Sequence, residues 1–409
     1  MTRLAIVSSH PIQYNAPAFR ALSAERGIEV RVFYGWEGPG TSQDHEFGRR
    51  VEWDIPLLDG YDYEFMENVS SNPGSHRFRG IDNPEMVARI RGWRPSVLLV
   101  YGWSFASHLR VLRAFHGSVP ILFRGDSTLL DERAKWRAFA RRIFLRWVYK
   151  HVDVALFTGT LNRAYFSAHG LREDQLVWAP HAVDNRRFQE ETEEREAEAL
   201  TWRRQLGIAD GDVVFLFAGK LVPRKGPALL LDAFNQLRES SASPRGRLIF
   251  VGEGEQAAGL RAETTERSDV CFLGFQNQSA MPVIYRLGNV MIMPSRYGET
   301  WGLAVNEAMA CSRPVIVSDR VGCAVDLVRT GETGFNFAHD DATGLRDAMR
   351  KILMDRVAGK AMGERAAALI EHWSISRYAS IVAEIARSLD GTGARDLELA
   401  PDVSGPSRD

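Results

Sequence analysis

The chain has 409 residues, 45% of them hydrophobic, which is too long for one ordinary core and predicts two domains of about 150 to 200 residues each. Its formal net charge of -1, with 25% charged residues, excludes a general electrostatic attraction to nucleic acid, so we expect no nucleic-acid partner. No apolar run approaches the roughly 18 residues that a membrane-spanning helix needs.

The three cysteines indicate the redox environment of the protein. Cys271, Cys311 and Cys323 form no C-x-x-C pair, and each lies in or beside an apolar segment. This arrangement is typical of buried thiols in a reducing compartment. The apolar run at residues 4–8 is too short for the core of a signal peptide. We therefore expect a cytoplasmic protein.

Short apolar runs alternate with helical segments in the first half of the chain. A helix is predicted at residues 17–25, and strands are predicted at 4–8, 30–34, 97–101, 121–123 and 152–157. This alternation indicates a parallel, doubly wound α/β domain, in which ligands bind at the carboxyl ends of the strands.

Polar loops follow three of these strands and carry side chains that can hold hydroxyl groups: His10, Gln13, Tyr14, Trp103, Arg124 and Asp126. For any single loop, a helix entry packed against its neighbours is the more ordinary interpretation. Three polar loops at one edge of a sheet favour a ligand site instead.

Residues 131–150 predict an amphipathic helix. Its apolar side chains fall on one face, and basic side chains crowd the rest. The apolar members are Trp136, Phe139, Ile143, Trp147 and Val148. We favour a surface helix whose aromatic face covers the sheet. The alternative is a helix that makes a peripheral contact with anionic lipid, since aromatic residues with Lys and Arg have the composition for it.

The middle of the chain is polar. Residues 189–204 are highly charged and predict a linker with a solvated helix. Asp210-Gly211-Asp212 matches a metal-binding D-x-D by its letters, but this triplet is ordinary turn chemistry. We predict no metal site.

A cationic loop bounded by glycines follows the apolar run at 213–218 and precedes a predicted helix at 228–238. It contains Gly219, Lys220 and Lys225. A strand, such a loop and a helix form the arrangement that holds a diphosphate. An ordinary turn with exposed lysines is the alternative, and it is weaker because each lysine sits directly beside a glycine.

Two further strands are predicted at residues 248–251 and 270–275. The first ends in Gly252-Glu253-Gly254, which looks like the start of a dinucleotide fingerprint. The third glycine of that fingerprint is missing, so we predict no nicotinamide or flavin cofactor.

The stretch from 289 to 335 is the centre of the predicted site. Buried strands are predicted at 290–293 and 315–318, with a helix at 303–310 between them. The start of this helix offers an anion backbone N–H groups and a favourable dipole, at Thr300, Trp301, Gly302 and Leu303.

Two glutamates frame that helix. Glu299 precedes it and Glu307 lies inside it, eight residues later. The spacing alone recurs elsewhere in the chain and proves nothing. In its context, however, the stretch resembles the Glu-x7-Glu motif of the retaining glycosyltransferases of family 4, which have the GT-B fold. The resemblance implies that Glu299 faces the donor sugar and that Glu307 hydrogen-bonds the ribose.

The resemblance covers most of residues 213–385 and implies further roles. Lys220 and Lys225 would hold the donor diphosphate, and the backbone from Leu273 to Phe275 would read the base. Lys220 stands where the family has arginine. By position, Asp126 is nearest to a family histidine that touches the sugar.

The resemblance also implies the architecture. We expect a GT-B fold with two doubly wound Rossmann-like domains facing across a cleft. The expected parts are an acceptor-side domain at 1–185, a nucleotide-sugar domain at 186–370, a terminal helix crossing back at 371–390 and a disordered tail at 391–409. Helical composition extends over 361–385.

The implied function is a retaining, metal-independent glycosyl transfer that uses no cofactor and serves polysaccharide biosynthesis. The donor would be a UDP- or GDP-sugar, and the acceptor a glycan, a lipid-linked glycan or a small molecule. Two alternatives stay open. One is a nucleotide-sugar epimerase or hydrolase of the same fold, and the other is a non-catalytic, membrane-associated scaffold.

Overall fold

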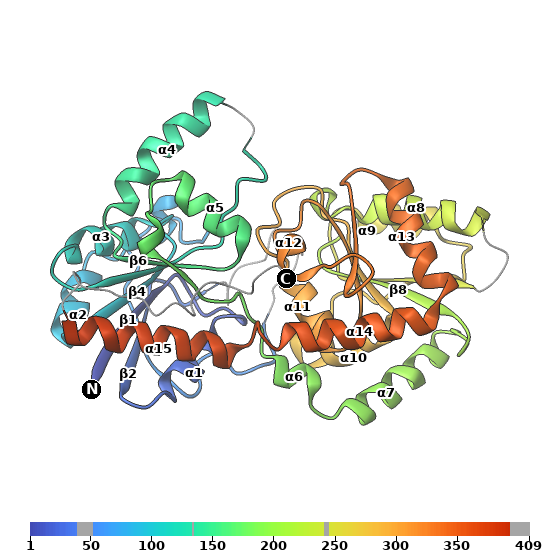
Figure 1. The fold of residues 1–409 in the computed structure, drawn as a ribbon, viewed down its shortest axis with the longest axis horizontal. Coiled ribbons are helices and arrows are strands. Elements are labelled where there is room, and N and C mark those ends of the chain that lie inside the picture. The colour runs from blue at the N-terminus through green and yellow to red at the C-terminus, as the bar shows by residue number, and fades with distance from the viewer. Residues whose placement is uncertain (39–51, 133–134, 241–244, 393–409) are drawn as a thin grey trace. The chain divides into compact units, whose positions relative to one another are not determined.

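The structure is a computed structural model, and it describes residues 1–38, 52–132, 135–240 and 245–392. The chain forms two compact units. The N-terminal unit comprises residues 1–42, 56–181 and 375–409, and the C-terminal unit comprises residues 43–55 and 182–374. Each unit is built on one parallel sheet (Figure 1).

The N-terminal unit has a seven-stranded parallel sheet in the order β3-β2-β1-β4-β5-β6-β7. Its strands are β1 (Thr2–Ser8), β2 (Ile28–Tyr34), β3 (Asp62–Phe65), β4 (Val97–Tyr101), β5 (Ile121–Arg124), β6 (Val154–Phe157) and β7 (Leu176–Trp178). Its helices are α1 (Ala16–Ser23), α2 (Met86–Trp93), α3 (Ala106–Phe115), α4 (Lys135–Tyr149), α5 (Thr160–Ala168) and α15 (Ile375–Thr392). The strand order reverses between β1 and β4, so a ligand crevice is expected at their carboxyl ends.

The C-terminal unit has a six-stranded parallel sheet in the order β10-β9-β8-β11-β12-β13. Its strands are β8 (Val213–Ala218), β9 (Gly246–Val251), β10 (Val270–Phe272), β11 (Val290–Met293), β12 (Val315–Ser318) and β13 (Gly334–Phe337). Its helices are α6 (Asn185–Gln189), α7 (Thr192–Gln205), α8 (Pro227–Ser240), α9 (Ala257–Glu263), α10 (Met281–Leu287), α11 (Leu303–Ala310), α12 (Ala324–Leu327), α13 (Ala342–Met354) and α14 (Arg356–Ile370). Here the strand order reverses between β8 and β11.

The central strands form because their apolar runs can be buried on both faces, as parallel sheets require. Strands β8 and β11 are almost entirely inaccessible to solvent. Both units match the prediction of doubly wound parallel sheets, which confirms the α/β class. The sequence missed β3, which is an edge strand with alternating charged and aromatic residues that stay partly exposed.

The last helix belongs to the core of the N-terminal unit. Tyr378 and Val382 of α15 are buried in one cluster with strand β1, and α15 packs beside α1 (Figure 1). The Tyr378 hydroxyl lies 2.6 Å from the hydroxyl of Tyr101 on β4.

The helical composition over 361–385 belongs to two helices, because α14 ends at Ile370 and α15, the terminal helix expected at 371–390, begins at Ile375. Between them Trp373 turns inward and is buried. The side chain of Asn185 donates a hydrogen bond to the Ile370 carbonyl over 3.0 Å, which satisfies the exposed end of α14. Composition alone does not show such a break.

The compact units change after His181 and after Ser374, whereas the sequence predicts boundaries after 185 and 370. Of the predicted tail, Gly391 and Thr392 are the last residues of α15, and 393–409 lie outside the described residues. Among the helices that the structure describes, none is both long enough and apolar enough to cross a lipid bilayer.

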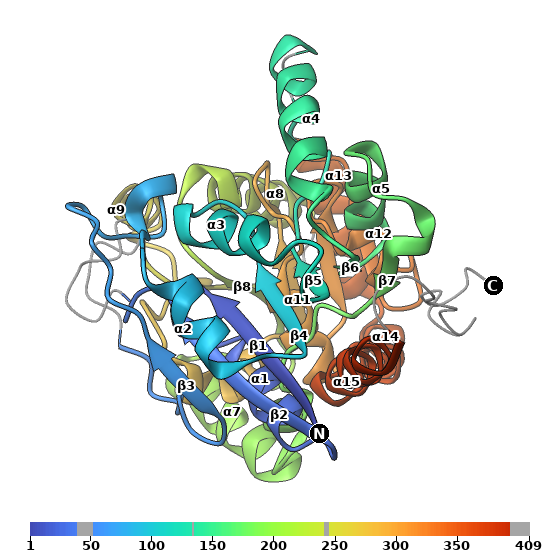
Figure 2. The same cartoon turned by 90° about the vertical axis from the view of Figure 1, so that its left-hand side faces the viewer.

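Helix α4 corrects the favoured interpretation of residues 131–150. It stands out from the body of the N-terminal unit in both views (Figure 1, Figure 2). Trp136 is 70% exposed, Phe139 66% and Ile143 56%, so this face does not cover the sheet. The buried residues Leu145, Val148 and Tyr149 anchor its last turns, and Arg141 in its middle donates a hydrogen bond to the Tyr165 hydroxyl over 3.0 Å.

Candidate functional site

The candidate site lies in the C-terminal unit, where the strand order reverses between β8 and β11. Loops follow the carboxyl ends of these strands, at residues 219–226 and 294–302. The β9 and β10 loops lie next to the β8 loop on one side, and the β12 loop lies next to the β11 loop on the other. The sheet therefore places the predicted cationic loop directly beside the predicted helix start.

The β8 and β11 loops approach closely at Gly226. Its backbone has φ +68°, and a Cβ atom placed there would lie 2.2 Å from the Pro294 carbonyl oxygen. The Arg296 N–H donates a hydrogen bond to the Arg224 carbonyl over 2.8 Å. Glycine is needed at 226 both for the left-handed conformation and for the contact.

This approach brings Lys225 and Glu299 together. The Lys225 ammonium and the Glu299 carboxylate form an ion pair, and the Ser295 hydroxyl donates to the same carboxylate oxygen over 3.1 Å. Both charged side chains are largely buried. The group predicted for the diphosphate and the group predicted for the donor sugar are therefore in direct contact. Lys220 follows Gly219 at the end of β8 and is half-buried.

The loop after β12 holds the start of α11. The Gly322 N–H donates to the Glu299 carbonyl over 3.0 Å, and the Cys323 N–H donates to the Trp301 carbonyl over 2.9 Å. The Trp301 ring is buried, and its N–H donates to the Asn306 side chain over 2.9 Å. Gly302 precedes the first helical residue, Leu303, and has φ +99°.

Glu307 lies inside α11 and is only 2% exposed. The Tyr285 hydroxyl donates a hydrogen bond to its Oε2 over 2.6 Å, and the Arg187 guanidinium lies 3.8 Å from its Oε1. Within the described part of the chain, Oε1 accepts no hydrogen bond. Burial raises the pKa of Glu307 to about 7, although Tyr285 and Arg187 act in the opposite direction.

Sequence reasoning missed Tyr285 and Arg187. Arg187 is held by Gln278, whose side-chain oxygen accepts from Nη2 over 2.8 Å and whose carbonyl accepts from Nη1 over 3.0 Å. Arg187 lies in α6, Gln278 in the turn before α10 and Tyr285 in α10, so no spacing in the sequence connects them with Glu307.

The predicted base-reading segment follows β10. The Leu273 N–H pairs with the Phe250 carbonyl over 2.9 Å, which extends the β9–β10 pairing by one residue. The Leu273 carbonyl accepts from the Gln276 side chain over 2.7 Å. Phe275 lies beside Trp53, with 6.5 Å between the ring centres. Trp53 was not predicted, because it lies between two strands of the other sheet in the sequence.

The predicted acceptor residues lie at the carboxyl edge of the seven-stranded sheet, in the N-terminal unit. His10, Gln13 and Tyr14 follow β1, and all three are partly exposed. Burial lowers the pKa of His10 to about 4, with a smaller contribution from His76, so its ring is neutral at pH 7. Trp103 follows β4 and packs edge-on against Phe144 of α4, with ring centres 5.3 Å apart.

Arg124 has a different environment from the one predicted. It is buried, and its guanidinium donates hydrogen bonds to the carbonyls of Leu156, Ala179 and Pro180. The guanidinium thus holds the ends of β6 and β7 together. These bonds use three of the five guanidinium N–H groups, and the place of Arg124 on the acceptor side stays a prediction.

Two neighbours of Arg124 complete this part of the unit. Asp126 is partly exposed. Burial and the nearby Arg124 lower the pKa of His181 to about 4, and Asp126 acts in the opposite direction. His181 is therefore neutral at pH 7.

The Asp210-Gly211-Asp212 triplet forms a structural turn. The Asp212 carboxylate accepts hydrogen bonds from the Arg247 side chain over 2.7 Å and from the Ala209 N–H over 3.1 Å. Within the described ranges, no cluster of three or more His, Cys, Asp or Glu side chains is arranged to hold a metal ion.

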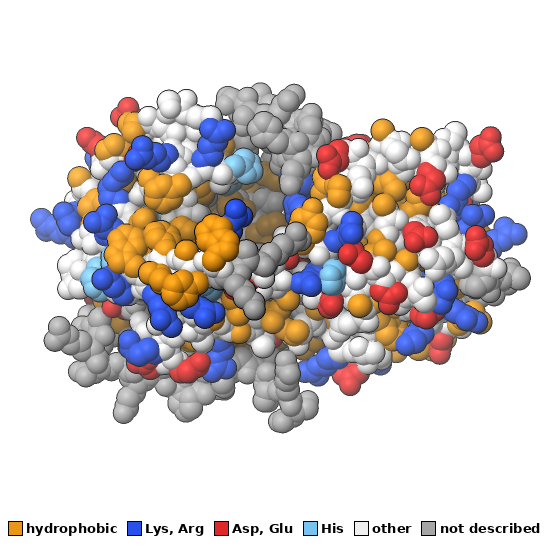
Figure 3. All heavy atoms as spheres, turned by 90° about the horizontal axis from the view of Figure 1, so that it is seen from above, with side chains coloured by type: hydrophobic (Ala, Val, Ile, Leu, Met, Phe, Trp, Pro, Cys, Tyr) orange, Lys and Arg blue, Asp and Glu red, His pale blue; other side chains and the backbone are white. Residues whose placement is uncertain are grey.

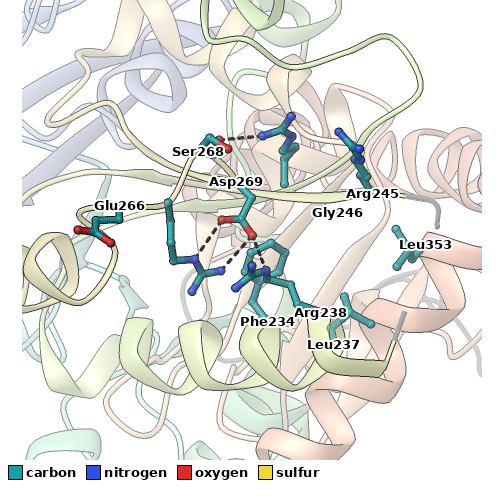
Figure 4. A pocket seen from close by; sticks show the side chains of 11 residues that line it. Phe234, Leu237, Arg238, Arg245, Gly246, Glu266, Ser268, Asp269 and Leu353 are labelled. Atoms are coloured by element: carbon teal, nitrogen blue, oxygen red, sulfur yellow. Dashed lines mark hydrogen bonds and ion pairs between the residues drawn. The ribbon is translucent and has the colours of Figure 1, made fainter. Parts of the chain in front are cut away.

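A pocket of about 410 Å³ opens at the opposite end of the C-terminal sheet, beside the first residues of β9 and β10 (Figure 4). Its lining is polar, but Asp269 is paired with both Arg238 and Arg267. The predicted site residues all lie at the other end of the strands, so this pocket is separate from the candidate site.

Comparisons with known proteins place this geometry in a family. The model described as glycosyl transferases group 1 matches residues 198–369. The chain is 30% identical over 366 residues to the D-inositol 3-phosphate glycosyltransferase of Geodermatophilus obscurus, covering 81% of this chain and 75% of the relative. It is 29% identical over 215 residues to a protein of the same name from Nocardia farcinica, covering 50% of this chain and 46%, or about half, of that relative.

Solved structures agree on the fold. The chain matches Anabaena HepE, crystallised in complex with UDP, with a TM-score of 0.72 and 20% identity. The match covers 95% of this chain and 100% of HepE. The predicted GT-B fold is confirmed.

The contact at Gly226 leads to a stability prediction. Gly226→Ala should lower the free energy of unfolding by about 1–3 kcal/mol more than Gly207→Ala does. Gly207 has a similar φ of +70°, but no atom lies within 4 Å of a Cβ placed there, so it controls for backbone strain alone. Chemical denaturation of both variants measures the difference, and equal losses would contradict the close contact.

The pKa of Glu307 leads to a pH prediction. Because burial raises this pKa from 4.5 to about 7, the folded state holds the proton more tightly, and the associated stability is lost as pH rises from 4.5 through 7. The unfolding free energy of the wild type minus that of Glu307→Gln should therefore fall between pH 5 and pH 8. Denaturation curves at four pH values test this, and a difference that stays flat or rises would refute it.

Proposed function

This chain belongs to the family of group 1 glycosyl transferases, and on that premise we propose that it moves a sugar from a nucleotide-sugar donor to an acceptor. We further propose that the transfer retains the anomeric configuration and needs neither a metal ion nor a cofactor. One observation carries the proposal. Lys225 is paired with Glu299, which leads directly into the helix that carries Glu307.

Stabilising the leaving diphosphate is the main chemical task, because negative charge grows on it as the bond to the sugar breaks. Lys220, Lys225 and the backbone N–H groups at the start of α11 would supply the compensating charge. These groups are held in place before the reaction, since the β8, β11 and β12 loops are hydrogen-bonded to one another. Metal independence is proposed because the chain offers these cations itself.

Donor binding would replace the Lys225–Glu299 ion pair. A phosphate oxygen would take the ammonium, and a sugar hydroxyl would donate to the freed carboxylate. After the exchange the ammonium is paired with the phosphate, and the carboxylate accepts hydrogen bonds from the sugar hydroxyl and from Ser295. Each charge therefore keeps a polar partner in a largely buried site.

Glu307 would bind the ribose of the donor. Its Oε1 is buried and accepts no hydrogen bond from the described residues, so a ribose hydroxyl that reached it would supply the missing donor. Tyr285 holds the other oxygen and fixes the orientation of the carboxyl group. The backbone from Leu273 to Phe275 would contact the base.

The donor is proposed to be a UDP- or GDP-sugar. The structural neighbour HepE was crystallised with UDP and also with UDP-glucose. A relative from Corynebacterium glutamicum is named as a GDP-mannose-dependent mannosyltransferase. We propose a glycan or lipid-linked acceptor as part of polysaccharide biosynthesis, with His10, Gln13, Tyr14, Trp103 and Arg124 on the acceptor side. Asp126 is proposed as a catalytic residue that touches the donor sugar.

We also propose that α4 makes a peripheral contact with an anionic membrane, at the cytoplasmic face. Its exposed apolar side chains form a patch bordered by basic side chains, which Figure 3 shows from above. Arg137 and Arg142 are exposed on the same helix, and the exposed Lys150 directly follows it. Apolar groups would enter the lipid boundary while the cations bind anionic headgroups. Such a contact would suit a lipid-linked acceptor.

Lys225→Ala should reduce the turnover rate by about 100- to 1,000-fold, because one preorganised charge on the leaving group is lost. The measurement is release of nucleotide from a panel of UDP-, GDP- and ADP-sugars, with donor-induced thermal stabilisation as the binding readout. Lys360→Ala, an exposed lysine on α14, is the matched control and should behave like the wild type.

The same assay separates the alternatives. Stabilisation of the wild type by no nucleotide sugar would end the proposal. Nucleotide release without any acceptor would indicate the hydrolase, and a changed sugar in the recovered donor would indicate the epimerase. Full activity in EDTA and an unchanged anomeric configuration in the product are expected.

The membrane contact is tested by sedimentation with vesicles. The wild type should bind vesicles that contain phosphatidylglycerol, less so at high salt, and should not bind neutral vesicles. A Trp136→Ala, Phe139→Ala, Ile143→Ala triple variant should lose binding. Val357→Ser, which alters an 82% exposed apolar residue on α14, should not. Binding by the triple variant that equals the wild type would return α4 to an ordinary surface helix.

A further inference from the structure

Three consecutive residues from the first part of the chain are docked on the C-terminal unit. Glu52, Trp53 and Asp54 lie between β2 and β3 in the sequence, yet they belong to the unit that holds the candidate donor site. We refer to residues 52–54 as the strap. Because a segment inserted between two strands would ordinarily stay with its own sheet, its position requires an explanation from its contacts.

The strap contacts the segment that directly follows the predicted base-reading backbone. The Asn277 side chain donates a hydrogen bond to the Glu52 carbonyl over 2.7 Å. The Ser279 N–H donates to the Asp54 carboxylate over 3.0 Å, and the Ser279 hydroxyl donates to its other oxygen. Between these polar contacts, the Trp53 ring lies beside Phe275.

The strand order places this contact at the far end of a bound nucleotide. On the proposed function the diphosphate lies at the β8 loop, and β10 is two strands away from β8. Two strand spacings amount to about 10 Å, a span that one nucleoside covers. The base would therefore arrive near Phe275 and Trp53.

Both rings can offer a surface to the base. Each is only partly buried, and the planes are tilted by 46° with centres 6.5 Å apart. This tilt leaves the rings splayed rather than stacked on each other. Bases stack on aromatic side chains through their π faces, whichever hydrogen-bonding groups they carry.

A chain of polar contacts also connects the strap to Glu307, the residue proposed to bind the ribose. Ser279, which the Asp54 carboxylate binds, follows Gln278, and Gln278 accepts both hydrogen bonds from Arg187. Arg187 in turn lies 3.8 Å from Glu307. Asp54 thus stabilises the turn that holds Arg187 beside Glu307.

We propose that the strap completes the donor site, with Trp53 as a specificity-determining residue that contacts the nucleotide base and Asp54 as a positioning residue. This inference rests on the proposed function, because it takes the nucleotide sugar as the ligand. It adds to that function a base-contacting side chain contributed by the first part of the chain.

Calorimetry with UDP and GDP on the full-length protein tests the role of Trp53. Trp53→Ala should weaken binding of the preferred nucleotide about 10-fold, and Trp53→Phe should restore most of it, because an aromatic face is what the base requires. In the transfer assay, KM for the donor should rise with little change in kcat. Trp202→Ala, a partly buried tryptophan on α7, is the control and should bind like the wild type.

Asp54 is tested by the pair Asp54→Ala and Asp54→Asn. The asparagine oxygen can still accept from the Ser279 N–H, so Asp54→Asn should keep a KM for the donor near the wild-type value, while Asp54→Ala should raise it several-fold. A merely structural contact would change the thermal midpoint of both variants without this split in KM.

The outcomes distinguish a failure of the proposed function from a failure of the strap inference. If the wild type binds neither nucleotide, the proposed function fails. If the wild type binds and folded Trp53→Ala and Trp53→Phe bind equally tightly, the strap inference fails while the proposed function stands. If Trp53→Ala does not fold, Trp53→Phe against Trp53→Leu makes the same comparison, and equal affinities would again overturn the inference.

Discussion

The candidate site depends on one close contact between two loops. The β8 loop and the β11 loop meet at Gly226 and Pro294, and this approach brings the Lys225 ammonium onto the Glu299 carboxylate. Neither charge could be buried alone at a reasonable energetic cost. Each is therefore acceptable in the site because the other is there. A ligand that carries both an anionic phosphate and hydroxyl groups can take over both partners at once.

Around this pair, the two glutamates have different surroundings. Glu299 is held by the Lys225 ammonium and the Ser295 hydroxyl. Glu307 lies deeper, where burial raises its pKa to about 7, and it keeps one oxygen free of hydrogen bonds from the described residues. The same residue type thus meets two environments within eight positions of the chain. That difference suits one carboxylate to the sugar side and the other to the ribose.

Helix α4 shows that the helical spacing of apolar residues does not determine what their face packs against. A stripe of aromatic residues at helical spacing is equally compatible with a core-facing helix and with one that faces a lipid boundary. The buried anchor residues lie in its last turns, and Trp136 and Phe139 in its first turns are exposed to solvent. The pattern could establish that α4 is amphipathic. Whether its apolar face meets the sheet or the solvent depends on how the rest of the unit folds around it.

Local patterns in the sequence determined most of the strands, the cationic loop and the start of α11, because each depends on a short run of residues. The strands that they missed, β3, β7 and β13, lie at the edges of the two sheets. The first and last residues of α11, Leu303 and Ala310, agree with the prediction. The sequence could not show that the Arg124 guanidinium donates to three carbonyls. Nor could it bring Tyr285 and Arg187 to Glu307, or Trp53 to Phe275. These contacts join segments far apart in the chain, and only the tertiary structure decides which distant segments meet.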